Sequence, residues 1–303
     1  MARTNAGNES FGFEGKCSFH GGPENVKDHR SWHFVPAHRP EYLERALEIE
    51  ADALVFDLED GVPDGEKEDA RTRLAAFLKA RRSIDHGRCY LRVNSDATAF
   101  RQDLALLRRW SFGGVVVPKV DTPGVLKSRM KAIARGTSAG RRIALIESFG
   151  AVSRLGAILD AWPLYGVGLG LEDMFSDIDL VPAQAADLSR HVKLRLVVEA
   201  KARGLVAIDT VSLEYRNRAS LSRRCAESRC LGFDGMFSIH PNQIEEINAA
   251  FSPRPDNLVW ARKIARLTSL RGGSGYSNEG GEVISPPKIR KARGILGRHG
   301  GGR

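Results

Sequence analysis

The stretch Gly166-Val-Gly-Leu-Gly-Leu-Glu172-Asp173 is a short apolar run, rich in glycine, that ends in two adjacent carboxylates. A run of this kind is typical of a buried strand that delivers acidic side chains at its carboxyl end. About twenty residues earlier the chain repeats the arrangement, because the apolar run 143–146 is followed by Glu147. Two consecutive strands that each end in an acid suggest that Glu147 and Asp173 share one cation.

An acid at such a position has a physical need for a cation. A carboxylate at the rim of an apolar core is costly to desolvate unless a charge meets it. We expect Mg2+, with Mn2+ as the alternative, because hard ions are held by one or two protein carboxylates while water and substrate oxygens complete the octahedron. The structural alternative is that Glu147 and Asp173 are helix N-caps or ion-pair partners at strand–helix turns. These two segments alone leave both interpretations open.

Outward from this stretch, short apolar runs alternate with longer helical patterns along most of the chain. The apolar runs are residues 32–35, 53–61, 89–94, 114–119, 143–146, 166–169, 206–209 and 235–240. The helical patterns lie near residues 41–50, 67–81, 100–109, 123–135, 152–160, 183–203 and 220–231. Nearly continuous apolar runs predict parallel strands buried on both faces. Eight strands predict a closed (β/α)8 TIM barrel; an open doubly wound sheet is the alternative, because alternation alone does not separate the two.

In a barrel, the polar residues just past each strand share one rim, where enzymes of this architecture carry out their chemistry. The residues expected at that rim are Asp57, Glu59, Asp60, Arg92, Asn94, Lys119, Glu147, Glu172, Asp173, Asp209 and His240. They are scattered in sequence, and we expect them to converge in space.

The chain is expected to have three parts. Residues 1–29 are rich in Gly, Asn, Glu and Ser and predict a disordered or irregular leader. Residues 30–252 form the barrel, and residues 253–303 form a basic helical extension or lid with a flexible connector at 271–281. Residues 251–303 hold eleven Lys and Arg against three Asp and Glu, so nearly all of the net charge of +9 lies there.

The composition is that of an ordinary soluble protein, with 42% hydrophobic and 27% charged residues in a chain of 303. No apolar run approaches the roughly 20 residues of a membrane span, and the first residues lack the apolar segment of a signal peptide. We therefore expect a cytoplasmic protein with no membrane partner. The cysteines show no CxxC spacing and are expected to be free thiols: Cys17, Cys89, Cys225 and Cys230.

Eight motifs, in order, carry a family resemblance. They are Arg30-Ser-Trp-His-Phe-Val-Pro36, Ala53-Leu-Val-Phe-Asp-Leu-Glu-Asp-Gly61, Leu91-Arg-Val-Asn94, Val117-Pro-Lys-Val120, Leu145-Ile-Glu147, Gly170-Leu-Glu-Asp173, Ala207-Ile-Asp-Thr210 and Ile239-His-Pro241. Together they resemble the citrate lyase beta-subunit-like proteins of the HpcH/HpaI aldolase superfamily, whose relatives include malyl-CoA and citramalyl-CoA lyases. The resemblance implies a (β/α)8 barrel, a homotrimer or hexamer, and Mg2+-dependent cleavage or formation of the carbon–carbon bond beta to a CoA thioester.

The resemblance also implies roles for single residues. Glu147 and Asp173 would be the metal ligands, and Arg92 would be the catalytic cation that faces the thioester or enolate oxygen. Glu59 would be a second catalytic residue, an acid near the water molecules of the metal. These roles agree with the chemistry, because cleavage generates an enolate and preorganised positive charge stabilises it.

Residues for substrate and CoA follow from the same resemblance. Arg30 and Lys67 would lie along the path of the CoA phosphates, and Asp57 would bind substrate together with Arg92. The structural alternative for Arg92 is an ion pair with Asp57 or Glu59 at the strand end.

Three positions depart from the pattern of the active lyases. Serine stands at Ser285, where the C-terminal segment of those enzymes carries an aspartate that acts as general acid or base over the neighbouring subunit's site. A serine hydroxyl without an adjacent base cannot shuttle a proton as a carboxylate does. Ala37 replaces a glycine and Met236 replaces a frequent lysine. These departures bear on lyase activity with a standard CoA substrate, whereas the metal site is predicted independently of them.

The leading prediction is a Mg2+-dependent lyase that converts a beta-hydroxyacyl-CoA into an acyl-CoA and a small 2-keto acid. The alternatives are an aldolase on a 2-keto or hydroxy acid without CoA and an acyl-CoA thioesterase. An alternative of another class is a catalytically weak metal-binding protein whose basic tail binds nucleic acid or an acidic partner. We do not expect nucleic acid, because the tail offers only Trp260 and Tyr276 for stacking bases.

Overall fold

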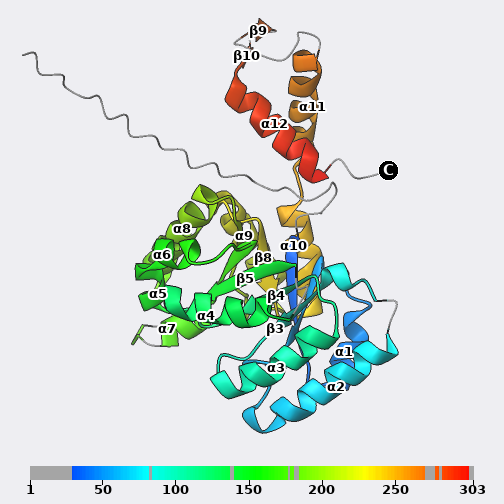
Figure 1. The fold of residues 1–303 in the computed structure, drawn as a ribbon. Helices are drawn as coiled ribbons and strands as arrows, with labels where there is room; N and C mark the ends of the chain where they lie inside the picture. Colours follow the sequence, from blue (N-terminus) through cyan, green and yellow to red (C-terminus); the bar gives the residue numbers. More distant parts are fainter. Residues whose placement is uncertain are drawn as a thin grey trace, which may run out of the picture. The chain divides into compact units, whose positions relative to one another are not determined.

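The computed structural model describes residues 29–81, 84–136, 140–176, 178–180, 184–269, 277–279 and 282–299 (Figure 1). These residues divide into two compact units, one up to residue 255 and one from residue 256 onward. The expected leader lies outside the described residues up to position 28, and so does Cys17. Of the other cysteines, Cys89 and Cys225 are buried and Cys230 is exposed, and all three are free thiols.

The first unit is a closed barrel of eight parallel strands in sequence order (Figure 1). The strands are β1 (Ser31–Pro36), β2 (Ala53–Asp57), β3 (Cys89–Arg92), β4 (Gly114–Val117), β5 (Arg141–Ile146), β6 (Gly166–Leu169), β7 (Val206–Asp209) and β8 (Gly235–Ser238). Strand β1 pairs with β2 on one side and with β8 on the other, which closes the cylinder. The (β/α)8 prediction is confirmed, and the open sheet is excluded.

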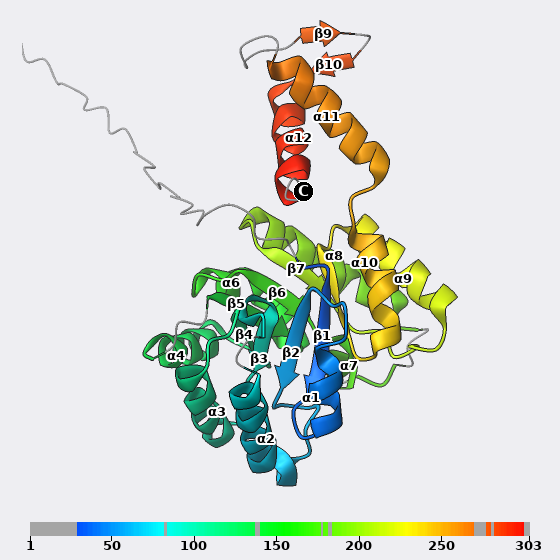
Figure 2. The ribbon, with the colours of Figure 1, turned by 90° about the vertical axis from the view of Figure 1, so that its right-hand side faces the viewer.

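Helices surround the barrel, and all but the last of them lie between successive strands (Figure 2). They are α1 (Pro40–Ala46), α2 (Lys67–Ala80), α3 (Ala97–Arg109), α4 (Pro123–Ala134), α5 (Phe149–Ser153), α6 (Leu155–Asp160), α7 (Leu171–Ser176), α8 (Ala186–Ala202), α9 (Arg218–Leu231) and α10 (Ile244–Phe251). The single helix expected near 152–160 is two short helices that meet at Arg154. Helices α7 and α10 were not predicted, because both are too short to show a clear period.

Side-chain caps fix where several helices begin after their strands. Asp96 accepts hydrogen bonds from the backbone N–H groups of Thr98 and Ala99, which starts α3. Thr122 caps α4 and Ser148 caps α5 in the same way. Because these caps stand within a few residues of the preceding strands, the loops that lead from β3, β4 and β5 into their helices are short.

Alternation along the strands divides the barrel into an inner and an outer face. The side chains that pack together inside the cylinder are Trp32, Ala53, Val55, Tyr90, Val116, Ile143, Leu145, Ile208 and Phe237. Their sequence neighbours, such as Leu54, Leu91 and Ala144, pack outward in the larger core beneath the helices. Asp57, Arg92 and Glu147 each stand two positions after a member of this inner set. Their side chains therefore lie inside the barrel at its carboxyl end.

Strand β6 presents glycine at every inward position, Gly166, Gly168 and the following Gly170. A Cβ added at Gly168 would lie 2.5 Å from a ring carbon of Phe237 and 2.6 Å from a methyl carbon of Leu145. Large side chains from β5 and β8 therefore fill the space that β6 leaves. The glycine-rich run is a packing requirement of the barrel interior.

We expect Gly168→Ala to destabilise the barrel by about 1–3 kcal/mol, because the added methyl group overpacks a filled interior. Urea unfolding followed by circular dichroism measures this change. Gly124→Ala on α4 is the matched control, since its Cβ would find the nearest atom 3.8 Å away. Equal stability of the two variants would show that the β6 glycines are not required for packing.

The second unit contains helices α11 (Pro255–Ser269) and α12 (Pro286–His299) and the antiparallel strands β9 (Ser277–Glu279) and β10 (Glu282–Ile284). Its small core consists of Ala261, Ile264, Ile284, Ile289 and Ala292. The prediction of a flexible connector at 271–281 was wrong in part, because strand β9 lies within that range. Ser285 directly precedes α12, and its carbonyl accepts the N–H of Ile289 at 3.0 Å.

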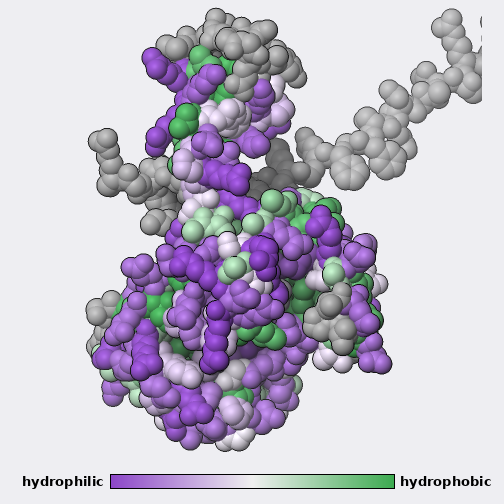
Figure 3. Space-filling view, turned by 180° about the vertical axis from the view of Figure 1, so that it is seen from behind, coloured by the Kyte–Doolittle hydropathy of each residue, from purple (hydrophilic) through white to green (hydrophobic). Residues whose placement is uncertain are grey.

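No helix in the described part of the chain is long and apolar enough to cross a membrane. The face of the molecule in Figure 3 is mostly hydrophilic, with apolar residues in small groups.

Candidate functional site

Three charged side chains meet inside the carboxyl end of the barrel. Asp57 ends β2 and Arg92 ends β3, and the parallel register places the two residues side by side. Glu147 follows β5 at the same end. All three are buried, with 1%, 8% and 6% of their surface exposed, respectively. Buried charges at this depth require partners.

Arg92 is held from three sides. Its Nε donates to Asp57 Oδ1 at 2.7 Å and its Nη2 to Asp57 Oδ2 at 2.6 Å, so the two groups form a bidentate pair. Its Nη1 lies 3.2 Å from Glu59 Oε2, and the guanidinium lies 4.6 Å from the centre of the Phe34 ring. Burial alone would lower the pKa of Arg92, but Asp57, Glu59 and Glu147 hold that pKa above its ordinary value.

Arg92 keeps donors for a ligand. A guanidinium has five N–H groups, and its contacts with described residues engage three of them, one each on Nε, Nη1 and Nη2. The two that remain belong to a cation whose plane is fixed by Asp57 and Phe34. The site therefore offers an oriented pair of charged donors.

Asp57 has no acceptor left for a substrate. Its Oδ1 accepts from Arg92 and from the backbone N–H of Glu59, and its Oδ2 accepts from Arg92 and from the N–H of Gly61. These four bonds use the acceptor sites of a carboxylate. Gly61 is required here, because a Cβ would lie 2.3 Å from Asp57 Oδ2. Asp57 thus orients Arg92 and shapes the loop after β2, and the prediction that it binds substrate loses its geometric basis.

Glu59 links the buried cluster to a more exposed one. Its Oε2 accepts from the N–H of Asp60 and faces Arg92, while its Oε1 lies 3.3 Å from Lys119 Nζ. Lys119 also binds Asp60 Oδ1 at 3.0 Å. Burial raises the pKa of Glu59, although Arg92 acts in the opposite direction. Glu59 is 2% exposed, so this link between the two clusters is buried.

Glu147 is a buried carboxyl with too little positive charge around it. Its Oε2 accepts the backbone N–H of Lys119 at 2.6 Å. Burial raises its pKa to about 8, with Arg92 lowering it and the charges of Glu59 and Asp173 raising it further. A Cβ at Gly170 would lie 2.7 Å from Glu147 Cγ, so the glycine makes room for this side chain.

Asp173 lies in the first turn of α7 and is exposed. Its charge contributes to the raised pKa of Glu147, so the two carboxylates are near enough to repel each other. Among the described residues, no third His, Cys, Asp or Glu joins them in a cluster of metal-binding groups. Two carboxylates, one of them buried and short of positive charge, fit Mg2+, which keeps several positions for water and substrate.

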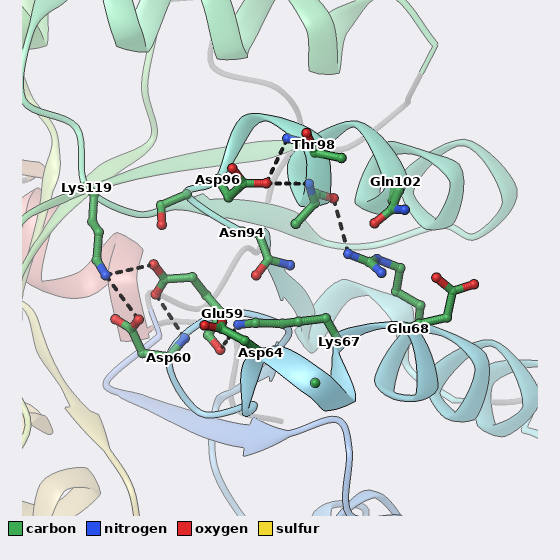
Figure 4. Close-up of a pocket in the computed structure, with 14 residues that line it drawn as sticks. Glu59, Asp60, Asp64, Lys67, Glu68, Asn94, Asp96, Thr98, Gln102 and Lys119 are labelled. Atoms are coloured by element: carbon green, nitrogen blue, oxygen red, sulfur yellow. Dashed lines mark hydrogen bonds and ion pairs between the residues drawn. The ribbon is translucent and has the colours of Figure 1, made fainter.

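A cavity of about 730 Å³ opens beside this cluster (Figure 4). Glu59 and Lys119 line it and also belong to the cluster around Arg92. The other lining residues are Asp60, Asp64, Gly65, Lys67, Glu68, Arg71, Asn94, Ser95, Asp96, Thr98, Ala99 and Gln102. Five carboxylates face three cations in this set, so the cavity is acidic.

The cations of the cavity are already engaged. Lys67 Nζ donates to the carbonyls of Leu58 and Glu59 at 3.0 and 2.6 Å. Arg71 binds the buried Asp103 at 2.8 Å. Asp103 also accepts from the backbone and side chain of Asn94, which fixes the loop after β3.

Two residues lie elsewhere than expected: Arg30, which was expected along the path of the CoA phosphates, and Asp209, which was expected at the rim. Arg30 precedes β1, and its guanidinium binds Asp52 and Ser252, so the structure does not bring it to the carboxyl end of the barrel. Asp209 points outward, where its carboxylate binds Lys193 at 2.8 Å and Ser228. Both placements follow from position relative to a strand: Arg30 comes before one, and Asp209 occupies an outward position of another.

Sequence reasoning missed three contributors to the site. Phe34 supports Arg92, Gly170 makes room for Glu147, and the backbone of Lys119 binds Glu147. The period of two along β1 and the spacing of the β6 glycines signal the first two. No sequence signal points to a backbone N–H.

Comparisons with known proteins cover most of the chain. The family model described as HpcH/HpaI aldolase/citrate lyase matches residues 30–241. The citrate lyase subunit beta-like protein of Mycobacterium tuberculosis (strain CDC 1551 / Oshkosh) is 29% identical over 89% of this chain and 95% of its own length. A (3S)-malyl-CoA thioesterase of Cereibacter sphaeroides (strain KD131) is 30% identical over 89% of this chain and 94% of its own length. The mitochondrial citramalyl-CoA lyase of Homo sapiens is 29% identical over 87% of this chain and 83% of its own length.

A solved structure agrees in fold and in sequence. Protein CitE from Mycobacterium tuberculosis, in complex with magnesium, acetoacetate and coenzyme A, superposes with a TM-score of 0.71 at 28% identity. The match covers 90% of this chain and 98% of that one.

Proposed function

The chain belongs to the HpcH/HpaI aldolase/citrate lyase family, and from this premise we propose that it is a Mg2+-dependent carbon–carbon lyase acting on a beta-hydroxyacyl thioester of coenzyme A. Its products would be an acyl-CoA and a small 2-keto acid. The resemblance read from the motifs is confirmed. The observation that supports the reaction is the buried Arg92, aligned by Asp57 beside Glu147 inside the mouth of the barrel.

Glu147 and Asp173 would hold the metal. When bound, Mg2+ supplies a Lewis acid for the carboxylate and carbonyl oxygens of the keto-acid portion. Glu147 suits this role because it lacks sufficient positive charge in the protein alone, and Asp173 suits it because its side chain is exposed toward solvent. Magnesium accompanies acetoacetate, and in another structure oxaloacetate, in homologues from Mycobacterium tuberculosis.

Arg92 would stabilise the anion that forms. In the cleavage, the hydroxyl proton leaves to water and the carbinol oxygen forms the carbonyl of the keto acid. The bond between the carbinol carbon and the thioester alpha carbon breaks, and its electron pair becomes the enolate of the acyl thioester. A proton then returns to that alpha carbon. The two remaining N–H groups of Arg92 would face the enolate oxygen, and their positions are set before the charge develops.

The cavity beside Arg92 would hold the thioester arm of coenzyme A. Its volume of about 730 Å³ accommodates a chain of amides, and its carboxylates and Asn94 offer partners for amide groups. Its acidic lining repels phosphates, so we propose that these lie outside the cavity. Lys67 then shapes the loop after β2 instead of binding phosphate, and Arg30 is left out of the site.

A thioesterase is the second candidate. The observation in its favour is Ser285, which offers no carboxylate to carry a proton during carbon–carbon cleavage. A relative from Cereibacter sphaeroides bears the name of (3S)-malyl-CoA thioesterase. The assembly into a trimer or hexamer stays a prediction.

Removing the metal should abolish the reaction and identify its class. With malyl-CoA or citramalyl-CoA and Mg2+, we expect release of a 2-keto acid, detected as its phenylhydrazone, and no free thiol. EDTA should lower the rate by about a hundredfold or more, and excess Mg2+ should restore it. Free thiol without keto acid would favour the thioesterase, and an unchanged rate in EDTA would exclude the metal mechanism.

A further inference from the structure

Lys119 has a backbone conformation that its residue type disfavours. Its φ is +49°, and it is the one non-glycine residue with positive φ in the described part of the chain. Lysine in the left-handed region costs free energy that glycine would not. Such an outlier persists only where the surroundings impose it, and outliers of this kind concentrate at functional sites.

The left-handed turn redirects one N–H group. Strand β4 pairs with β5 up to Val117, and Val120 again donates to the carbonyl of Leu145 at 3.2 Å. Between them, the N–H of Lys119 turns to Glu147 Oε2 at 2.6 Å. No other residue in the described ranges donates a hydrogen bond to this carboxylate. The orientation of Glu147 therefore depends on the conformation of Lys119.

The side chain explains why glycine does not occupy the position. The ammonium of Lys119 lies 3.0 Å from Asp60 Oδ1 and 3.3 Å from Glu59 Oε1 (Figure 4). Glu59 in turn contacts Arg92. One residue thus contacts three acids, one through its backbone and two through its side chain.

On the basis of the proposed function, we propose that Lys119 is a positioning residue whose left-handed backbone aims Glu147 at the metal, while its ammonium holds Glu59 beside Arg92. It does not touch the reacting atoms. The ammonium is paired with two carboxylates, which makes it a poor nucleophile, so Lys119 does not form a Schiff base with the keto acid.

Two substitutions separate the backbone from the side chain. Lys119→Gly removes the ammonium but adopts positive φ freely, whereas Lys119→Val removes the same ammonium and strongly disfavours positive φ. Isothermal titration calorimetry with Mg2+ alone measures the Mg2+ affinity, which depends on the position of Glu147, and it does not require turnover. We expect Lys119→Gly to bind Mg2+ within about threefold of the unaltered chain and Lys119→Val to bind it about tenfold or more weakly.

Activity gives the second readout. Loss of the ammonium should lower kcat/KM about tenfold in Lys119→Gly even though Mg2+ binding is kept. Circular dichroism selects a temperature at which all variants are folded. Lys119→Ala, which disfavours positive φ less than valine does, should bind Mg2+ with intermediate affinity and serves if the valine variant does not fold.

The outcomes are distinct. Equal Mg2+ affinity of the glycine and valine variants would overturn the backbone role. A Lys119 adduct trapped by borohydride in the presence of pyruvate would overturn the exclusion of a Schiff base. If the unaltered chain binds no Mg2+ at millimolar concentration, the proposed function fails and this inference fails with it. If the unaltered chain binds Mg2+ and the two variants do not differ, only the inference about Lys119 fails.

Discussion

Glu147→Gln is expected to lower kcat/KM by about a thousandfold, which corresponds to about 4 kcal/mol of transition-state stabilisation. The reason is the loss of one of two proposed metal ligands. Glutamine has the same length, and its amide oxygen can accept the N–H of Lys119 as Glu147 Oε2 does. The substitution therefore removes charge with little change of shape.

Stability and metal binding should respond in opposite ways. Because burial raises the pKa of Glu147 to about 8, the fold favours the neutral carboxyl. The contribution of this group to stability therefore falls as the pH rises from its pKa in the unfolded chain toward 8. The neutral glutamine should leave the metal-free protein as stable at pH 8, or more so. Mg2+ should raise the melting temperature of the unaltered protein but not that of the variant.

Differential scanning fluorimetry with and without Mg2+ measures both effects. Since Glu147 must lose its proton to bind a cation, the rise in melting temperature should be larger at pH 8 than at pH 6. Glu227→Gln is the matched control, because Glu227 forms an exposed ion pair with Arg190 on the outer helices. A full Mg2+-induced shift in Glu147→Gln would rule out Glu147 as a ligand.

Arg92→Lys is expected to lower kcat about a hundredfold or more while Mg2+ still raises the melting temperature. Lysine keeps the positive charge that Asp57 and Glu59 require, so the fold should survive. It cannot reproduce the planar fork that binds both oxygens of Asp57. The charge then loses its fixed orientation toward the enolate.

Steady-state kinetics with the CoA ester, combined with the same fluorimetry, separates this effect from loss of metal. Arg190→Lys serves as the control, because the pair of Arg190 with Glu227 is exposed and contributes little. Asp57→Asn gives a second test, since it weakens the bidentate pair and leaves Arg92 in place. Unchanged kcat in both Arg92→Lys and Asp57→Asn would remove Arg92 from the proposed mechanism.

Most of the barrel could be read from the chain. The runs at 166–169 and 206–209 coincide with β6 and β7, because a strand buried on both faces must be apolar throughout. The sequence did not predict helices α7 and α10 or the break at Arg154, because packing against the barrel sets their limits and local periodicity does not.

The candidate site could be read only in part. Their position after a strand correctly predicted that Arg92, Glu59 and Glu147 meet at one end of the barrel. The same reasoning was wrong for Asp209, whose side chain points outward to Lys193. Whether a strand residue points inward or outward depends on the neighbours against which it packs. Asp57 was expected at the substrate, yet its four hydrogen bonds become visible only when Gly61 and Arg92 are placed around it.

The sequence by itself determined the eight apolar strands, their alternation with helices, the family, and the strand ends where the acids collect, because apolar periodicity and strand order are properties of the linear chain. Only the tertiary structure decided that the sheet closes, which of those acids lacks positive charge, which N–H groups of Arg92 have no partner among the described residues, and which backbone N–H orients Glu147. These depend on distances of a few ångströms between strands that are far apart in sequence. Burial and electrostatic coupling arise from that proximity alone.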